Sequence, residues 1–181
     1  MLGTLPKELE KVIQGLEVLV VDDNAYTRRV IRTLLHNVGI KNTHEAGDGI
    51  AGLEAIRMFS PHICIIDWEM PLLNGAEMVR IVRSPGVFPT PHLPIIMLSG
   101  YAERWRVLEA QRLGANEFLI KPVSGKILFE RIVAILKKPR PAVQPGDDLP
   151  ETGDQPLPEM MSPPIAPDER ADLAPSPRAA P

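Results

Sequence analysis

The chain has 181 residues, and 20 basic side chains against 23 acidic ones give it a net charge of −3. The segment from Pro139 to Pro181 holds 12 of the 20 prolines and carries a net charge of −5, which leaves residues 1–138 at +2. This nearly neutral body argues against bulk binding of nucleic acid, so we expect no nucleic-acid partner. Cys64 is the only cysteine, which excludes a disulfide framework within one chain. No apolar stretch approaches the roughly 18 residues of a membrane-spanning helix, so we expect a cytoplasmic protein without membrane insertion.

The proline-rich segment 139–181 has few large apolar side chains to offset the entropy cost of ordering it. We therefore predict that it is a disordered acidic tail. Residues 16–138 would then form one domain, preceded by a lead-in over residues 1–15. Apolar residues at helical spacing permit a short helix over 5–16, although a frayed lead-in fits the same pattern.

Apolar runs alternate with amphipathic segments along residues 17–138, in a strand–helix order that repeats five times. This alternation predicts a doubly wound α/β fold, in which helices cover both faces of a parallel sheet. The five strands are expected over 17–22, 42–46, 63–67, 94–98 and 117–120. The helices between and after them are expected from the Asn24 cap to Gly39, from the Asp48 cap to Pro61, over 76–83 after a turn at Asn74-Gly75, over 102–113, and from the Ser124 cap onward.

Polar side chains follow four of the five predicted strands. They are Asp22 and Asp23 at the first strand, Asp67 at the third, Ser99 at the fourth and Lys121 at the fifth. The carboxyl ends of parallel strands meet at one edge of the sheet, where open α/β sheets bind their ligands. Three carboxylates, a hydroxyl and an ammonium at one edge suit Mg²⁺ and a phosphoryl group.

These side chains fit a site of phosphoryl transfer. The Asp67 carboxylate can attack phosphorus and hold it as an acyl phosphate. Asp23 directly, and Asp22 through water, can supply ligands for Mg²⁺, which keeps several of its waters. Lys121 can pair with one phosphate oxygen, and Ser99 can donate a hydrogen bond to another. Each residue alone has a simpler interpretation as a helix cap or a turn, so only their joint occurrence favours the site.

Four segments resemble the receiver domain of two-component response regulators, which has the CheY-like or flavodoxin-like fold. The similarity covers about residues 16–138 and rests on Val20-Val21-Asp22-Asp23-Asn24, Asp67-Trp68-Glu69-Met70-Pro71 with Asn74-Gly75, Leu98-Ser99-Gly100, and Gly114-Ala115-Asn116-Glu117-Phe118-Leu119-Ile120-Lys121-Pro122. The resemblance implies a sheet in the order 2-1-3-4-5 and a cis peptide at Lys121-Pro122. It also implies that Asp67 accepts a phosphoryl group from a histidine kinase or phosphotransfer protein. The implied ligands of Mg²⁺ are Asp22, Asp23, Asp67 and the backbone carbonyl of Glu69.

The resemblance also assigns the residues that respond to phosphorylation. Ser99 and Phe118 are the expected moving parts, and Phe118 stands where the family most often has tyrosine. Glu69 and Tyr101 occupy the two positions that tune the lifetime of the phosphoryl group in the family. Glu69 adds an acid beside the site, which bears on turnover and on metal affinity.

The implied output surface consists of helix 102–113, the fifth strand and the last helix. Trp105 and Val107 mark this surface, which would contact a downstream protein or a second copy of the chain. Trp105 stands between two arginines, a composition typical of interface hot spots. Simple packing of Trp105 across the helix surface explains the pattern equally well.

We therefore expect a single-domain response regulator that signals by phosphorylation-dependent protein–protein contact. It would be no enzyme beyond catalysing its own phosphorylation and dephosphorylation. Three alternatives stay open: a phosphorylation-independent receiver scaffold, a phosphoaspartate phosphatase of the haloacid dehalogenase type, and a flavin-binding module. The phosphatase needs a second acid two residues after its nucleophile, and Glu69 has that spacing. The flavin module needs a phosphate-binding loop where Asp22 and Asp23 would repel the cofactor.

Overall fold

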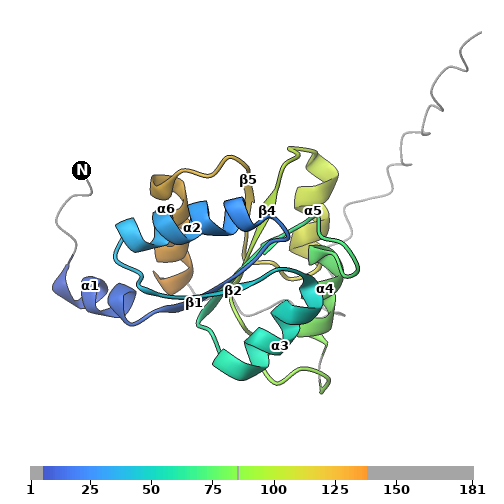
Figure 1. Cartoon of the computed structure of the whole chain (residues 1–181), viewed down its shortest axis with the longest axis horizontal. Coiled ribbons are helices and arrows are strands. Elements are labelled where there is room, and N and C mark those ends of the chain that lie inside the picture. The colour runs from blue at the N-terminus through green and yellow to red at the C-terminus, as the bar shows by residue number, and fades with distance from the viewer. Residues whose placement is uncertain (1–5, 85, 138–181) are drawn as a thin grey trace, which may run out of the picture. The chain divides into compact units, whose positions relative to one another are not determined.

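The computed structural model describes residues 6–84 and 86–137, which form a sheet flanked by helices (Figure 1). All strand pairs are parallel, and the order β2-β1-β3-β4-β5 confirms the predicted topology. The strands are β1 (Glu17–Val21), β2 (Asn42–Ala46), β3 (Ile63–Asp67), β4 (Ile95–Ser99) and β5 (Glu117–Ile120). The inner strands β1, β3 and β4 are buried along nearly their whole length, whereas the edge strands are partly exposed. The predicted tail over 139–181 lies outside the described residues.

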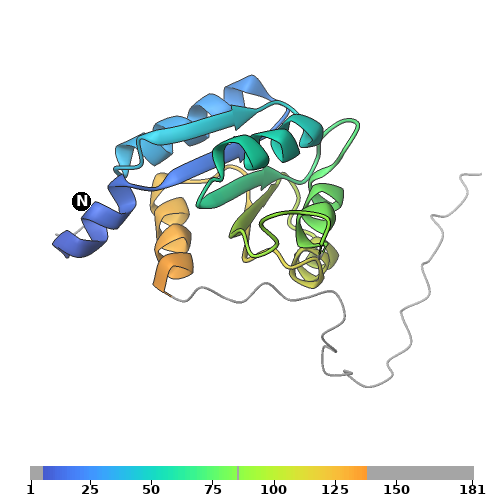
Figure 2. The ribbon, with the colours of Figure 1, turned by 90° about the horizontal axis from the view of Figure 1, so that it is seen from below.

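Helices cover both faces of the sheet (Figures 1 and 2). One face packs against α2 (Ala25–Asn37) and α6 (Gly125–Lys137), and the other against α3 (Gly49–Phe59), α4 (Gly75–Arg83) and α5 (Arg104–Arg112). Neighbouring residues of a strand alternate between these two cores, because side chains in a strand have a period of two. In β1, Val20 points toward α2 and α6, while Val21 belongs to the opposite core. Within the part of the chain that the structure describes, no helix has the length and apolar character to cross a bilayer.

A short helix, α1 (Lys7–Gln14), precedes β1. The sequence left a helix and a frayed lead-in equally open, and the structure shows the helix. Ile13 and Leu16 are buried in the core beneath α2 and α6, so this segment adds to the domain. Because α1 directly precedes β1, it lies at the amino ends of the strands, away from the carboxyl ends (Figure 1).

Side-chain caps set the beginnings of four helices, and at α6 the Oγ of Ser124 accepts from the N–H of Ile127 at 3.3 Å, as predicted. Asn24 accepts hydrogen bonds from the backbone N–H groups of Tyr26 and Thr27, and Asp48 caps α3, both as predicted. Asn74 is the cap of α4, in a reciprocal pair with Glu77, so that helix begins one residue earlier than expected. The start of α5 also differs from the prediction. It begins at Arg104 instead of Ala102, because Glu103 still has an extended backbone.

The first residue of α4 lies directly against the end of β3. A Cβ atom at Gly75 would stand 2.1 Å from the backbone oxygen of Asp67, which is closer than any side chain permits. The N–H of Gly75 also donates to the oxygen of Trp68 at 3.0 Å. The Asn74-Gly75 pair therefore holds α4 against the strand end that carries Asp67.

Candidate functional site

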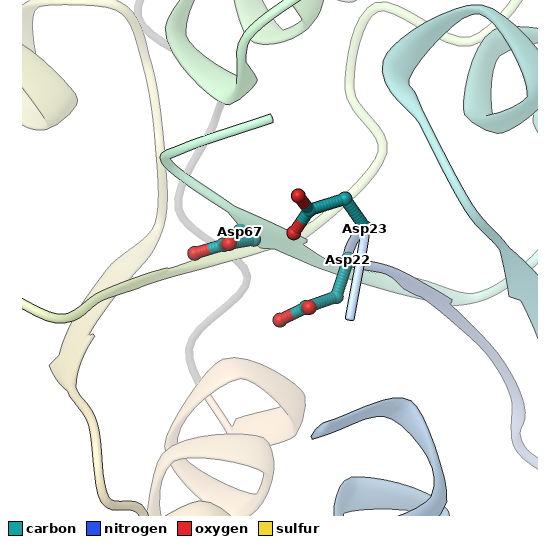
Figure 3. Close-up of side chains that lie close together, drawn as sticks. All are labelled: Asp22, Asp23 and Asp67. Atoms are coloured by element: carbon teal, nitrogen blue, oxygen red, sulfur yellow. The ribbon is translucent and has the colours of Figure 1, made fainter. Parts of the chain in front are cut away.

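Three aspartates meet at the carboxyl edge of the sheet (Figure 3). Asp22 and Asp23 directly follow β1, and Asp67 is the last residue of β3. Each offers a carboxylate oxygen, and these oxygens all lie within 4.8 Å of one another. Asp22 and Asp67 are buried, whereas Asp23 is exposed, so the cluster is open on one side.

Lys121 brings a positive charge into this cluster from the end of β5. Its Nζ lies 2.7 Å from Oδ2 of Asp22 and 2.9 Å from Oδ1 of Asp67, and therefore bridges two of the three carboxylates. The peptide bond between Lys121 and Pro122 is cis, as the resemblance implied. Burial alone would lower the pKa of Lys121, but its hydrogen bonds and charge interactions with Asp22 and Asp67 outweigh burial and raise it. Lys121 therefore stays charged at neutral pH.

Asp67 lies in an environment that opposes its ionisation. Burial is the largest influence and raises its pKa, and the neighbouring charge of Asp22 acts in the same direction. The ammonium of Lys121 and the backbone N–H of Glu69 lower the pKa without cancelling the effect of burial. A cation added to the site would favour the carboxylate form, which is the form able to attack phosphorus.

Ser99 ends β4 between the strand ends that carry Asp67 and Lys121. Its side chain is fully buried, and Oγ accepts a hydrogen bond from the N–H of Tyr101 at 3.1 Å. The backbone oxygen of Ser99 accepts from the N–H of Lys121 at 2.8 Å. Ser99 is therefore hydrogen-bonded both to the loop that follows β4 and to the backbone at the end of β5, so movement of Ser99 would affect both segments.

The donor set fits a magnesium ion. Mg²⁺ prefers oxygen ligands from a few carboxylates and keeps several waters. Here three carboxylates face one ammonium, so two negative charges stay uncompensated when all are ionised. Asp22, Asp23 and Asp67 would hold the ion, with water on the open side. The backbone carbonyl of Glu69 remains a predicted ligand.

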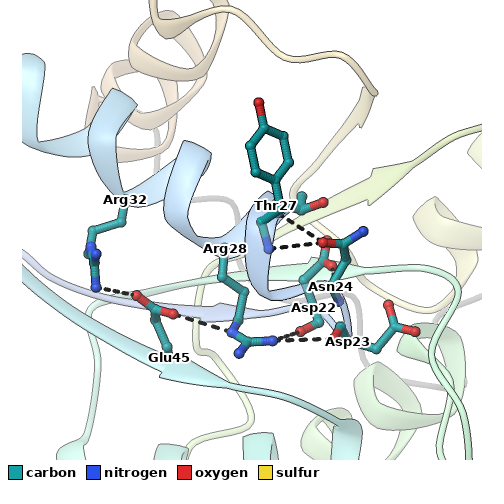
Figure 4. A network of polar contacts seen from close by, with 8 residues as sticks. Asp22, Asp23, Asn24, Thr27, Arg28, Arg32 and Glu45 are labelled. Carbon is teal, nitrogen blue, oxygen red and sulfur yellow. Dashed lines mark hydrogen bonds and ion pairs between the residues drawn. The ribbon is translucent and has the colours of Figure 1, made fainter.

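An arginine that sequence reasoning missed fixes the loop of the two adjacent aspartates (Figure 4). Nη1 of Arg28 donates to the backbone oxygen of Asp22 at 2.7 Å and to that of Asp23 at 3.4 Å. Its Nε lies 3.2 Å from the carboxylate of Glu45 on β2, which also pairs with Arg32 at 2.7 Å. The sequence carried no signal for these contacts, because they depend on how long side chains turn across the loop.

Two of the predicted switch and output residues, Phe118 and Trp105, pack against Trp68. Phe118 is half-buried, with its ring centre 6.2 Å from that of Trp68, the residue after Asp67. Trp105 meets the same Trp68 ring edge-on at 5.9 Å, yet it is still 55% exposed. Val107 is half-buried on α5. Trp105 therefore packs against Trp68, while the exposed part of its ring leaves the interface role a prediction.

Lys121 also lines a mostly apolar groove. The groove has a volume of about 360 Å³ and is lined by α2 and by the chain that follows β5. Its walls include Tyr26, Val30, Lys121 and Pro122. Tyr26 is 75% exposed, which leaves a large ring available at the groove's rim.

Known proteins resemble this chain over the region that contains the site. The family described as "Response regulator receiver domain" matches residues 18–133. Chemotaxis protein CheY of Pseudomonas aeruginosa is 33% identical over 123 residues, which span 68% of this chain and 98% of the relative. Chemotaxis protein CheY-3 of Vibrio cholerae serotype O1 is 30% identical over 125 residues, which span 69% and 95% of the two chains.

Solved structures resemble the fold in the same region. The receiver domain of the Francisella response regulator 1452 has a TM-score of 0.62 and 30% identity, over 68% of this chain and 98% of that one. The Vibrio cholerae chemotaxis protein CheY4 has a TM-score of 0.60 and 27% identity, over 66% and 98%. Both the sequence and the backbone therefore match one family along its whole domain length.

Proposed function

Because the chain belongs to the family of response regulator receiver domains, we propose that it is a phosphorylation-controlled signalling protein whose Asp67 accepts a phosphoryl group. The observation that carries the proposal is the Lys121 ammonium, which bridges Asp67 and Asp22 at the open carboxyl edge of the sheet. One carboxylate is thereby placed beside a fixed cation and two further acids. Receiver domains are signalling proteins and not enzymes that turn over a separate substrate.

The proposed reaction is transfer from a phosphohistidine of a histidine kinase or phosphotransfer protein. An oxygen of Asp67 attacks the phosphorus, the P–N bond breaks, and the imidazole leaves with the electron pair and takes up a proton. Lys121 would exchange part of its contact with the carboxylates for a phosphoryl oxygen, and the Ser99 hydroxyl would donate to another. Mg²⁺, held by Asp22, Asp23 and Asp67 with the Glu69 carbonyl, would supply positive charge against the phosphoryl oxygens.

The groove beside Lys121 supports the approach of a protein donor. We assign it to the surface of the donor that carries the histidine, because the groove is mostly apolar and Lys121 of the acidic site is one of its lining residues. An exposed aromatic ring such as Tyr26 at the rim suits a protein partner.

The proposed output surface comprises α5, β5 and α6. Phosphorylation needs an element with two states to report it. Ser99 and Phe118 would be that element, since Ser99 is bonded to the Tyr101 and Lys121 backbone and Phe118 contacts Trp68. Trp105 and Val107 would then meet a downstream protein or a second copy of the chain. We also propose that residues 16–138 act as the receiver.

The phosphatase alternative loses support from the position of Glu69. An acid that protonates a leaving group must face the reacting atoms. The Glu69 carboxylate instead pairs with the guanidinium of Arg106 at 3.1 Å. A receiver that stores the phosphoryl group fits this arrangement better than an enzyme that turns over phosphomonoesters.

Incubation with acetyl phosphate and Mg²⁺, followed by measurement of the intact mass, tests the proposal. We expect one phosphoryl adduct that disappears when a chelator removes Mg²⁺ and is absent from Asp67→Asn. Asp67→Asn keeps the size of the side chain, so its fold should survive. A phosphorylation-independent scaffold would show no adduct in the parent protein, and equal labelling of Asp67→Asn would contradict the assignment.

A further inference from the structure

Arg106 on α5 joins two carboxylates that belong to different parts of the chain. Its Nη1 lies 3.1 Å from Oε1 of Glu69, in the loop after β3, and its Nε lies 2.5 Å from Oε2 of Glu103, just before α5. The Arg106 side chain is only 13% exposed, whereas both carboxylates are about half exposed. One largely buried guanidinium therefore connects the loop that follows Asp67 to the beginning of α5.

Three aromatic rings surround the same guanidinium. Its central carbon lies 4.8 Å from the ring centre of Tyr101, 5.0 Å from that of Trp105 and 5.6 Å from that of Trp68. A cation within about 6 Å of an aromatic face is attracted by the charge distribution of the ring. Trp68 directly follows Asp67, so Arg106 contacts two consecutive residues after the phosphoacceptor candidate.

The first turn of α5 depends on these contacts. Glu103 at the N-cap makes no capping hydrogen bond, and the first turn carries Arg104 and Arg106 without an acid. Positive charge at a helix N-terminus is unfavourable, because the helix dipole is positive there. Ala110 is the only buried residue of α5. The helix thus has little packing of its own, and the Arg106 cluster holds its beginning against the rest of the domain.

Glu69 completes the path from the acidic site to α5. Its backbone N–H lies near enough to the Asp67 carboxylate to lower the pKa of that carboxyl, while its side chain pairs with Arg106. Although Nη1 of Arg106 lies within ion-pair range of Glu69, it is fully buried and makes no aligned hydrogen bond to any residue that the structure describes. This N–H group is therefore held by the charge of Glu69 and by the surrounding rings, without a hydrogen bond that would fix its direction.

We propose that Arg106 is a positioning residue that transmits occupancy of the acidic site to the first turn of α5 through Glu69. The proposal rests on the function proposed above and adds a second connection to that of Ser99 and Phe118. A group bound at Asp67 changes the charge and the position of the carboxylate that the Glu69 N–H faces. The Glu69 carboxylate then shifts against Arg106, and the first turn of α5 loosens or tightens with it.

Glu103 provides a matched control, because it pairs with the same guanidinium but adjoins α5 itself. Hydrogen exchange of the α5 amides, read by mass spectrometry, should be measured in the parent, Glu69→Gln and Glu103→Gln, first without ligand, then with Mg²⁺ alone, and then with Mg²⁺ and acetyl phosphate. Without ligand, each variant should lower protection of the α5 amides that bond to the carbonyls of the first turn by about two- to fivefold, which corresponds to loss of one partly exposed ion pair. With ligand, Glu103→Gln should still show the change in α5 exchange seen in the parent, and Glu69→Gln should lose it.

Arg106→Gln and Arg104→Gln extend the test along the helix. Arg106→Gln should behave like Glu69→Gln, and Arg104→Gln, which changes an exposed neighbour, should behave like the parent. Equal responses of Glu69→Gln and Glu103→Gln, whether both kept or both lost, would overturn the role of the Glu69 connection. The intact mass of each sample shows separately whether Asp67 is loaded. If the parent takes up no phosphoryl group, the proposed function fails, while the Mg²⁺ arm still decides the role of Arg106.

Discussion

The ammonium of Lys121 lies 2.9 Å from Oδ1 of Asp67. Asp67 is the last residue of β3 and Lys121 follows β5, and β4 lies between these two strands. The parallel topology creates this proximity, because β3, β4 and β5 all deliver their last residues to the same edge. Lys121 also pairs with Asp22, so the lysine is shared between two acids. The site is therefore prepared for a second cation and for an anionic group that would take over part of the lysine's contacts.

Lys121→Ala should separate metal binding from switching. The three carboxylates remain in the variant, and the competing ammonium is gone, so Mg²⁺ should bind at least as tightly as in the parent. The change in tryptophan emission caused by acetyl phosphate should be lost, since no ammonium links the phosphoryl group to the strand of Phe118. Fluorescence titration measures both responses. A parent-like emission change on phosphorylation would show that Lys121 has no coupling role. Lys121→Arg is unsuitable as a control, because the planar guanidinium of arginine binds phosphate in a different geometry from the compact ammonium of lysine.

Phosphorylation should depend on pH through Asp67. Burial raises the pKa of this carboxyl, so the reactive carboxylate is lost at a higher pH than for an ordinary aspartate. The rate of labelling by acetyl phosphate should fall as pH decreases through this raised pKa. Saturating Mg²⁺ should move the fall to lower pH, because a bound cation favours ionisation. A profile that does not respond to the Mg²⁺ concentration would contradict this assignment of the titrating group.

Asp67→Asn should increase the stability of the metal-free protein. A carboxyl whose pKa is higher in the folded state than in the unfolded state binds its proton more tightly when folded. Its contribution to stability is then present at low pH and is lost as pH rises through the folded pKa, so the ionised Asp67 costs stability at neutral pH. The neutral amide removes this cost.

The same variant should lose most of the stabilisation by Mg²⁺. In the parent, Mg²⁺ at 100 times its dissociation constant should add about 2.7 kcal/mol to the free energy of unfolding. Denaturant unfolding with and without Mg²⁺ measures both effects at neutral pH. Lower metal-free stability of Asp67→Asn, or an unchanged gain from Mg²⁺, would oppose the proposed electrostatics.

Gly75→Ala should destabilise the domain and disturb the site together. The new Cβ atom would stand 2.1 Å from the backbone oxygen of Asp67, so α4 or the end of β3 must move. We expect a loss of about 1–3 kcal/mol in the free energy of unfolding. Gly100→Ala is the control, because a Cβ atom there meets nothing within 4 Å. Similar losses in the two variants would show that the contact between α4 and β3 is unimportant.

The sequence was sufficient for the strands and for the polar residues that follow them. Buried parallel strands need continuous apolar runs, and the polar residue that ends each run lies at a known edge of the sheet. The strand order came from the resemblance to receiver domains, and this order brings Asp22, Asp67 and Lys121 close together at that edge.

The contacts of long side chains could not be predicted from the sequence. Arg83 illustrates the reason: it is almost fully buried on α4 and donates to the backbone oxygens of Gly114 and Pro91, and burial lowers its pKa to about 10. Nothing in its spacing distinguishes it from the exposed Arg80 on the same helix. The pairing of Arg106 with Glu69 was missed for the same reason. Trp105 was expected either at an interface or packed across the helix surface, and its contact with Trp68 depends on the path of the loop between β4 and α5.

The most direct test of the account is to locate the phosphoryl group. The protein is treated with acetyl phosphate and Mg²⁺ and then with borohydride, which reduces an aspartyl acyl phosphate to homoserine with release of phosphate. Peptide sequencing by mass spectrometry should find homoserine at position 67 alone, and none when Mg²⁺ is omitted. Homoserine at Asp22 or Asp23, or labelling that persists in Asp67→Asn, would contradict the central claim that Asp67 accepts the phosphoryl group.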